Sequence, residues 1–254
     1  MRSFFLANMP LRSGDTMMLP IALRHHLDRV LRLQPGVEIR LFDGTGRVAV
    51  AVLQDKGQAC VRELYDSAPP PCQIQLIQGL AKGDKTELIL QKGTELGVSS
   101  FHLVSMERSV ARFKPESRQR SRWEKTIQEA ARQCGQYHLP GLCCSDSLKS
   151  ALSTEQTGLK LMLWEQTDVP LAAVVNKGDC RRISVIVGPE GGISETEAAA
   201  ARACGYQCVS LGPRILRTET AGLAIITVLQ YLYGDLSCGY GSIKQTHSYG
   251  KDIS

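Results

Sequence analysis

Short apolar runs separated by turn signals dominate the first third of the chain. The runs lie at 37–42, 48–53 and 59–64, and the turns between them lie at 43–46 and 56–57. Asp43-Gly44 between apolar runs favours a tight hairpin, because glycine adopts the positive φ that such turns need. The pattern predicts a small antiparallel β-barrel, interrupted by one helix at about 22–31.

A proline triplet lies within the segment 66–72. Three prolines cannot continue a helix or a central strand, so this segment is the best candidate for a linker. We therefore expect one domain at 1–68 and a second at 73–236. The remaining residues, 237–254, are polar and rich in Gly and Ser, and we expect a disordered tail there.

Beyond the linker, the pattern alternates between mostly apolar strands and amphipathic helices. The expected strands are 74–78, 99–104, 159–164, 183–187 and 208–211, and the expected helices are 84–97, 115–135, 194–205 and 221–233. Asp84 with Glu87, and Ser194 with Glu197, have the spacing of capping boxes. This alternation predicts an α/β domain with a mostly parallel sheet.

Composition sets broad limits on the class of protein. The chain has 254 residues, 43% of them hydrophobic, and a net charge of +5. This balance permits a polyanionic partner without requiring one. The nine cysteines form no C-x-x-C motif, and no apolar run reaches the length of about 20 residues that spans a bilayer. We expect reduced thiols, no metal, no membrane contact and a cytoplasmic location.

Candidate chemistry lies in the loops that follow the apolar strands, where parallel sheets bind ligands. Gly188-Pro189-Glu190-Gly191-Gly192 is glycine-rich, but it is neither a dinucleotide fingerprint nor a Walker A loop. Glu190 would repel a phosphate, so a neutral or cationic ligand suits this loop better. The alternative interpretation is a plain structural turn.

The loop 212–220 places Arg214, Arg217 and Glu219 between an apolar strand and an apolar helix. One interpretation is a solvated connection that carries an internal ion pair. The other is a site that combines an arginine for an anionic substrate with a carboxylate and backbone donors.

The strings GPEGGIS (188–194) and LGPRILRTETA (211–221) resemble the two cofactor motifs of the SPOUT methyltransferases. More closely, they resemble the SPOUT family that methylates N3 of a specific uridine in the decoding region of 16S ribosomal RNA. The resemblance extends to about residue 236 and includes Gln91-Lys92-Gly93-Thr94-Glu95-Leu96-Gly97. In one departure, Gln136 stands where the family usually has arginine, which shifts the expected RNA contact to Arg132.

The resemblance implies a fold that periodicity does not show. It consists of an N-terminal PUA-like β-barrel followed by a SPOUT-type α/β domain with a C-terminal trefoil knot. The implied cofactor is S-adenosylmethionine, bound in a site that a homodimer completes. The implied cofactor-binding residues are Leu163, Glu165, Gly188, Glu190, Gly191, Gly192, Leu211, Gly212, Ile215, Leu216, Arg217 and Thr220.

The same resemblance suggests roles in catalysis and RNA binding. Arg217 is expected to stabilise the uracil anion or a flanking phosphate, with Glu219 orienting it; alternatively, Glu219 is only a structural partner. The expected partner is 16S rRNA within the small ribosomal subunit. The expected RNA-binding residues are Arg2, His25, Arg29, Arg32, Lys82, Lys92, Arg108, Arg112 and Arg132. The basic run at 108–125 is open to a plainer interpretation as a solvated helix face.

Three alternatives remain open. A nucleotide-dependent oxidoreductase fits the α/β pattern but lacks the dinucleotide fingerprint. A non-catalytic RNA-binding or assembly protein could keep the fold, and the same scaffold could methylate another RNA nucleoside. Binding of S-adenosylmethionine separates the catalytic from the non-catalytic possibility.

Overall fold

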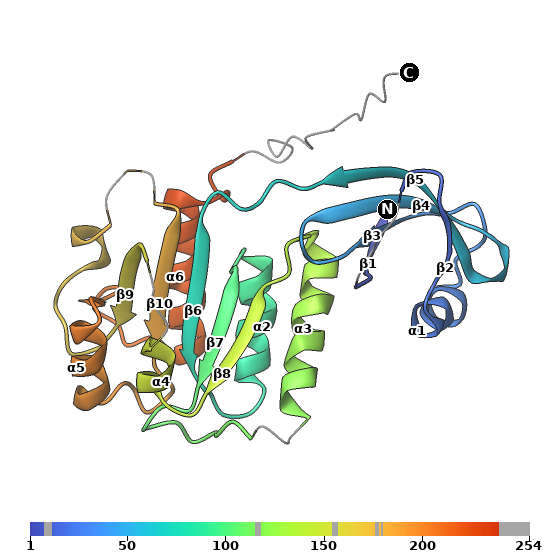
Figure 1. Ribbon diagram of the computed structural model, residues 1–254. Helices are drawn as coiled ribbons and strands as arrows, with labels where there is room; N and C mark the ends of the chain where they lie inside the picture. Colours follow the sequence, from blue (N-terminus) through green and yellow to red (C-terminus); the bar gives the residue numbers. More distant parts are fainter. Residues whose placement is uncertain (8–11, 115–117, 154–156, 176–177, 179, 239–254) are drawn as a thin grey trace. The chain divides into compact units, whose positions relative to one another are not determined.

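The computed structural model describes residues 1–7, 12–114, 118–153, 157–175, 178 and 180–238 (Figure 1). Contacts divide the described chain into two units. Unit 1 contains 1–69 and 131–139, and unit 2 contains 70–130 and 140–238. Residues 131–139 lie inside the range 73–236 that the sequence suggests for the second domain, yet they pack with unit 1.

Unit 1 is built on a five-stranded sheet with the order β1-β3-β4-β5-β2. Its strands are β1 (Arg2–Phe5), β2 (Thr16–Met18), β3 (Glu38–Phe42), β4 (Arg47–Leu53) and β5 (Gln58–Asp66). The three apolar runs expected to form strands, 37–42, 48–53 and 59–64, correspond to β3, β4 and β5. The expectation of a purely antiparallel arrangement was wrong, because β1 pairs with β3 in parallel. With four and three residues, β1 and β2 are too short to show an alternating pattern.

The expected helix at 22–31 is present as α1 (Ile21–His25), which continues into a π-helical turn at His26–Val30. Leu27 is buried there and joins Ile39, Leu41 and other apolar residues in the core of unit 1. A second cluster joins Phe42 and Tyr65 of the sheet to Ala131. This cluster explains why residues 131–139 belong to unit 1.

Unit 2 contains a six-stranded sheet with the order β11-β9-β10-β6-β7-β8, in which every recorded pairing is parallel. Its strands are β6 (Gln73–Gly79), β7 (Ser100–Val104), β8 (Gly141–Ser145), β9 (Leu159–Leu163), β10 (Arg182–Val187) and β11 (Gln207–Val209). The α/β expectation is confirmed. Sequence patterning missed β8, whose adjacent residues Cys143 and Cys144 are both solvent-accessible rather than buried on two faces.

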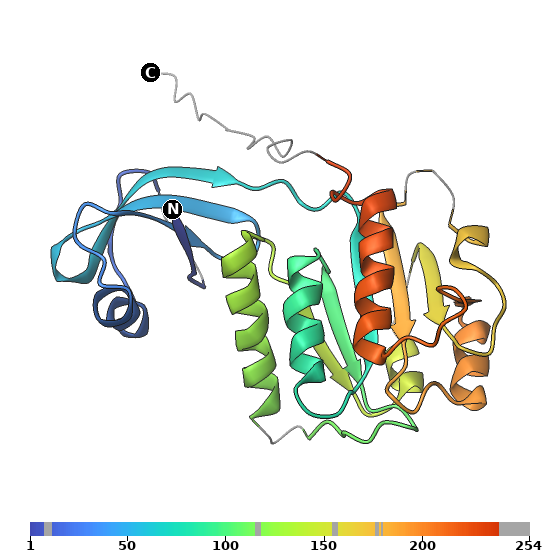
Figure 2. The same cartoon turned by 180° about the vertical axis from the view of Figure 1, so that it is seen from behind.

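Helices cover both faces of this sheet. They are α2 (Lys85–Glu95), α3 (Gln119–Cys134), α4 (Leu148–Leu152), α5 (Glu195–Ala203) and α6 (Thr218–Tyr233). Helices α2 and α6 contact one another on one face (Figure 2). Ile77 and Ile186 point to the opposite face, where they pack with residues of α4 and α5. The two-residue period of a strand explains how neighbouring residues reach opposite layers.

Only one of the two expected capping boxes forms. Ser194 Oγ accepts from the Glu197 N–H at 3.2 Å, and the Glu197 carboxylate accepts from the Ser194 N–H. At α2 the expectation was wrong, since the Asp84 side chain makes no capping bond. Glu87 instead accepts a hydrogen bond from Arg122 of α3 at 2.7 Å.

Helix α6 begins at Thr218, three residues before the expected start at 221. Arg217 therefore occupies the N-cap position without a side-chain capping bond, and Glu219 lies in the first turn. Most of the expected tail at 237–254 lies outside the described residues. Within the described ranges, no helix is long and apolar enough to cross a membrane, and no group of three His, Cys, Asp or Glu side chains could hold a metal ion.

Candidate functional site

A pocket of about 650 Å³ opens at the carboxyl ends of β9, β10 and β11. Its walls are the loops 163–168, 187–193 and 209–218, together with Lys85 and Ala221. All of these segments belong to unit 2. Three adjacent parallel strands end at the same edge of the sheet, so their loops converge, as expected for an α/β ligand site.

Most of the residues expected to bind a cofactor line this pocket. They are Leu163, Glu165, Gly188, Glu190, Gly191, Gly192, Leu211, Gly212, Ile215, Leu216 and Arg217. Thr220 is the exception: it is exposed and is not part of the lining. Because α6 starts early, helical periodicity turns Thr218 and Ala221 toward the pocket instead.

Several lining residues were not singled out from the sequence. They include Lys85, Thr167 and Asp168. Thr167 and Asp168 lie in the loop that follows β9, so their position after a strand end was a usable signal. Lys85 comes from the first turn of α2, and no local pattern indicates that it reaches this pocket.

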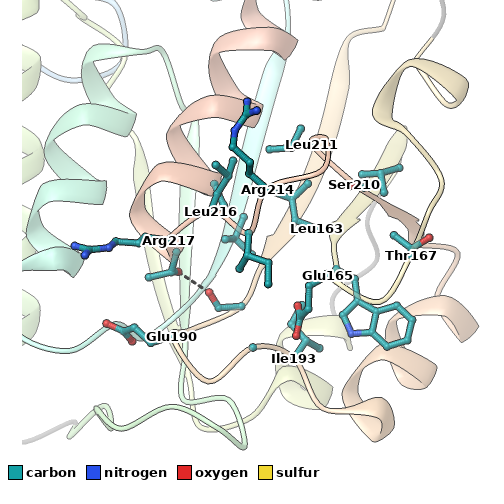
Figure 3. Close-up of a pocket in the computed structure, with 18 of the residues that line it drawn as sticks. Leu163, Glu165, Thr167, Glu190, Ile193, Ser210, Leu211, Arg214, Leu216 and Arg217 are labelled. Carbon is teal, nitrogen blue, oxygen red and sulfur yellow. Dashed lines mark hydrogen bonds between the residues drawn. The ribbon is translucent and has the colours of Figure 1, made fainter.

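Gly192 allows the glycine-rich loop to pass close to a carboxylate. Its φ of +75° lies in the left-handed region that favours glycine. A Cβ at this position would lie 2.6 Å from Glu165 Oε1. The absence of a side chain at residue 192 therefore keeps Glu165 in the pocket wall. Figure 3 shows Glu165 and Glu190 lying apart across the pocket, with Arg217 on the side of Glu190.

A buried polar link joins the glycine-rich loop to the start of α6. Gln78, fully buried at the end of β6, donates from Nε2 to Thr218 Oγ1 at 2.9 Å and to the Gly79 carbonyl at 3.0 Å. The Thr218 hydroxyl in turn donates to the Gly188 carbonyl. These bonds hold the ends of β6 and β10 and the N-terminus of α6 in register around the pocket.

Lys85 bridges two carboxylates beside the pocket. Its Nζ atom lies 3.1 Å from Glu190 Oε1 and 3.4 Å from Glu219 Oε2. The hypothesis that Glu219 pairs with Arg217 was wrong, since its ion partner is Lys85. Among the described residues, Arg217 makes no ion pair or side-chain hydrogen bond, and its side chain remains available at the pocket.

The bridge changes the pKa values of both Lys85 and Glu190. The hydrogen bond to Glu190 is the main cause that raises the pKa of Lys85. Burial works to raise the pKa of Glu190, but hydrogen bonds from its own N–H, from Lys85 and from the Lys82 N–H outweigh burial and lower it. Both groups therefore carry their charges near neutral pH.

Charged side chains of both signs line the pocket, and its cations come from Lys85, Arg214 and Arg217. Three carboxylates line it, from Glu165, Asp168 and Glu190, and Glu190 is already paired with Lys85. A pyrophosphate would meet these carboxylates in a loop without the lysine and hydroxyl of a phosphate-binding motif.

The residues expected to bind RNA are distributed over both units. In unit 1, Arg2, His25, Arg29 and Arg32 are exposed, and the guanidinium of the half-buried Arg132 lies over the Phe4 ring, 5.9 Å from its centroid. Gln136 donates to the His138 carbonyl at 3.2 Å. Its side chain thus has a local structural contact.

In unit 2, Lys82, Arg108 and Arg112 are exposed, whereas Lys92 is half-buried. Lys92 forms an ion pair with Glu95 at 2.9 Å. Arg112 donates to the carbonyls of Met106 and Glu107, which holds the loop after β7 closed. Lys92 and Arg112 therefore have structural partners, while the side chains of Lys82 and Arg108 are more open to a ligand.

Comparison with known proteins identifies relatives of both units. Residues 68–230 match the family described as an RNA methyltransferase domain, and residues 23–64 match an RNA methyltransferase PUA domain. Ribosomal RNA small subunit methyltransferase E of Bacillus subtilis is 33% identical over 223 residues, covering 82% of this chain and 86% of that protein.

Solved structures agree with these sequence matches. The crystal structure of a ribosomal RNA small subunit methyltransferase E from Neisseria gonorrhoeae, bound to S-adenosylmethionine, has a TM-score of 0.83 and 34% identity, covering 93% of this chain and 99% of that one. A methyltransferase from Legionella pneumophila, also with bound S-adenosylmethionine, has a TM-score of 0.83 and 28% identity over 92% and 98% of the two chains. This chain therefore belongs to the ribosomal RNA small subunit methyltransferase E family.

Proposed function

We propose that this protein transfers a methyl group from S-adenosylmethionine to N3 of one uridine in 16S rRNA, uridine 1498 in standard numbering. The observation that carries the proposal is the pocket at the ends of β9, β10 and β11, lined by the two motifs shared with the family. The family match over 68–230 supports the reaction class, and the PUA-domain match over 23–64 supports an RNA substrate.

The pocket residues fit S-adenosylmethionine. When bound, this cofactor supplies an electrophilic methyl group on a cationic sulfonium. Glu165, Asp168 and Glu190 provide negative charge around such a cation. Gly188, Gly192 and Gly212 let backbone approach the ligand closely, and the backbone groups of Leu211 and Leu216 are available to an adenine edge. The volume of about 650 Å³ lies within the range of small-molecule pockets.

Arg217 is the proposed catalytic cation. Uridine N3 carries a weakly acidic proton, so its methylation requires both removal of that proton and stabilisation of the resulting uracil anion. The unpaired guanidinium of Arg217 lines the pocket and suits that anion or a flanking phosphate. Glu219 acts from the first turn of α6 through Lys85 rather than through Arg217.

The proposed RNA contacts come from the exposed basic residues of both units, and the proposed substrate is 16S rRNA within the small ribosomal subunit. Contacts with phosphates would make the affinity fall as salt rises. The target base must also be unstacked to expose N3. Because the substrate is ribosomal RNA, we propose that the protein acts in the cytoplasm.

A homodimer is proposed on the basis of the face formed by α2 and α6. Leu88 of α2 is 40% exposed, and Val228 and Tyr231 of α6 are 38% and 63% exposed. Exposed apolar residues on adjacent helices suit burial against a second copy of the chain. The trefoil knot implied by the family resemblance stays a prediction.

The test is nucleoside mass mapping of 16S rRNA lacking this modification after incubation with isotope-labelled S-adenosylmethionine. Assembled small subunits and free 16S rRNA serve as parallel substrates. We expect one labelled N3-methyluridine, formed more rapidly on assembled subunits. A different methylated nucleoside would instead favour the same scaffold with another target. Cofactor binding below detection in calorimetry would favour a non-catalytic RNA-binding or assembly protein.

A further inference from the structure

The Lys85 bridge lies beside the proposed reaction site and connects the two loop motifs, since Glu190 belongs to 188–194 and Glu219 to 211–221. Lys85 and Glu190 line the pocket, whereas Glu219 supports Lys85 from behind. Their side chains are 33%, 29% and 14% exposed, in that order. Surface ion pairs contribute little to stability, so this three-residue cluster calls for a chemical explanation.

Three donors hold the Glu190 carboxylate in place. Oε1 accepts from Lys85 Nζ and from the Lys82 backbone N–H, each at 3.1 Å. The backbone N–H of Glu190 itself also donates to this carboxylate. A carboxylate has about four acceptor sites, so these three donors hold its orientation and leave one site available to a proton donor in the pocket.

Glu219 restrains the Lys85 ammonium, which in turn holds Glu190. Its Oε2 atom is buried and has no partner with hydrogen-bond geometry, and the Lys85 ammonium at 3.4 Å is its neutralising charge. Moving Lys85 away would leave this buried carboxylate unpaired, which is costly. Lys85 is therefore restrained from both sides.

We infer that Glu190 accepts the N3 proton of the target uridine, and that Lys85, anchored by Glu219, positions its carboxylate for that step. This inference rests on the proposed function. Glu190 touches the reacting base and is a catalytic residue in this scheme. Lys85 and Glu219 act through it and are positioning residues.

The proton transfer balances within the pocket. The N3–H bond of uracil breaks, an O–H bond forms on Glu190, and the electron pair stays on N3, delocalised onto the two ring carbonyls. Arg217 offsets the negative charge on the base. After methylation, Glu190 releases its proton to solvent, because its preferred state beside Lys85 is the carboxylate.

Charged groups on every neighbouring element influence the ionisation of Glu190. Lys82 lies just before α2 and Lys85 is its first residue, while Arg217 and Glu219 come from the start of α6. Arg108, from the loop after β7, donates to the Gly191 carbonyl at 3.4 Å. Glu165 and Asp168 are the other carboxylates of the pocket lining, and the hydrogen bonds from Lys85 and from backbone N–H groups lower the pKa of Glu190.

The experiment measures kcat against pH for the full chain at saturating cofactor and RNA. Glu190→Gln keeps the shape of the side chain and should lower kcat about 100-fold or more, the usual contribution of a general base. Lys85→Met should raise the pKa of Glu190, so the acid limb of the kcat profile moves to higher pH. Lys85→Arg should restore much of the original profile.

A second readout follows Glu190 directly. Carboxyl-carbon NMR of glutamate-labelled protein, compared with the Glu190→Gln spectrum, identifies its resonance. Its titration midpoint should rise in Lys85→Met and stay unchanged in Lys160→Met. Lys160 is a matched control, because it also donates a hydrogen bond, to the Cys204 carbonyl at 2.9 Å, but lies outside the pocket lining.

The outcomes separate this inference from the proposed function. If the unmodified chain methylates uridine and Glu190→Gln retains its kcat, the role of Glu190 is refuted while the proposed function stands. If Glu190→Gln regains full kcat at high cofactor concentration, Glu190 only binds the cofactor. Its role as the proton acceptor is then also refuted, while the proposed function stands. Absence of uridine methylation by the unmodified chain would refute both.

Discussion

Replacing Thr218 with valine tests the polar link between β6, β10 and α6. Valine keeps the volume and branching of threonine, so the change removes one hydroxyl without creating a cavity. That hydroxyl donates to the Gly188 carbonyl and accepts from Gln78 Nε2 at 2.9 Å. Because Thr218 is only 6% exposed, water has little access to replace either bond.

The expected loss can be estimated from the groups left without partners. Gln78 keeps its bond to the Gly79 carbonyl, and the Gly188 carbonyl keeps only a longer contact with Gln78 at 3.4 Å. A buried polar group without a good partner costs about 1–3 kcal/mol. We expect the free energy of unfolding to fall by about 2 kcal/mol. With a urea m value of about 2 kcal/mol/M, the midpoint then falls by about 1 M.

Tryptophan fluorescence during urea unfolding measures this loss. Both tryptophans, Trp123 and Trp164, belong to unit 2, so the signal reports on the unit that contains the substitution. Thr227→Val is the matched control on the same helix, since Thr227 is exposed and its hydroxyl bonds to the Leu223 carbonyl at 2.8 Å. That variant should change stability by less than about 0.5 kcal/mol. Equal midpoints for the two variants would refute the reasoning.

Three further predictions concern the pocket and the sheet. Gly192→Ala introduces strain at φ +75° and a clash with Glu165, so calorimetric affinity for S-adenosylmethionine should weaken about fivefold or more, equivalent to about 1 kcal/mol. Burial lowers the pKa of His102, so stability in urea titrations should fall as pH drops below about 6.5, and His102→Gln should reduce that slope. Arg217→Ala should lower kcat for RNA methylation about 100-fold, while cofactor affinity changes little.

Each of these predictions has a distinguishing outcome. Gly36→Ala carries similar strain at φ +90° but meets no atom within 4 Å, so it should leave cofactor affinity unchanged. For His102, the unfolded chain binds the proton more readily than the folded chain, which is why acid destabilises the fold. Equal slopes of stability against pH in the unmodified chain and in His102→Gln would contradict this. Loss of cofactor binding in Arg217→Ala, with RNA binding intact, would argue against its catalytic role.

Long elements with strong patterns could be predicted from the sequence. The alternating run of β4, the apolar run of β10 and the capped helix α5 all formed where local residues indicated them. Short elements could not be predicted in this way. β1 has four residues and α4 has five, which is too few to define a period, and each depends on neighbours distant in sequence.

Local motifs also failed where a tertiary partner competed for the same group. Asp84 and Glu87 have the spacing of a capping box, yet Glu87 bonds to Arg122 of the neighbouring helix. Arg217 and Glu219 are charged residues of the same loop between an apolar strand and an apolar helix, which suggested a mutual pair. Once α6 starts at Thr218, Glu219 meets Lys85 instead, across more than 130 residues of chain.

The sequence alone determined the class of the fold, the strand ends that carry the ligand site and the family motifs of its loops. These features depend on local periodicity, on glycines and on short strings of residues, all of which can be read along the chain. The tertiary structure decided which side chains meet. Lys85 joined Glu190 and Glu219, and Thr218 replaced Thr220 at the pocket, because ion pairing and buried hydrogen bonding depend on distances between elements that no local pattern encodes.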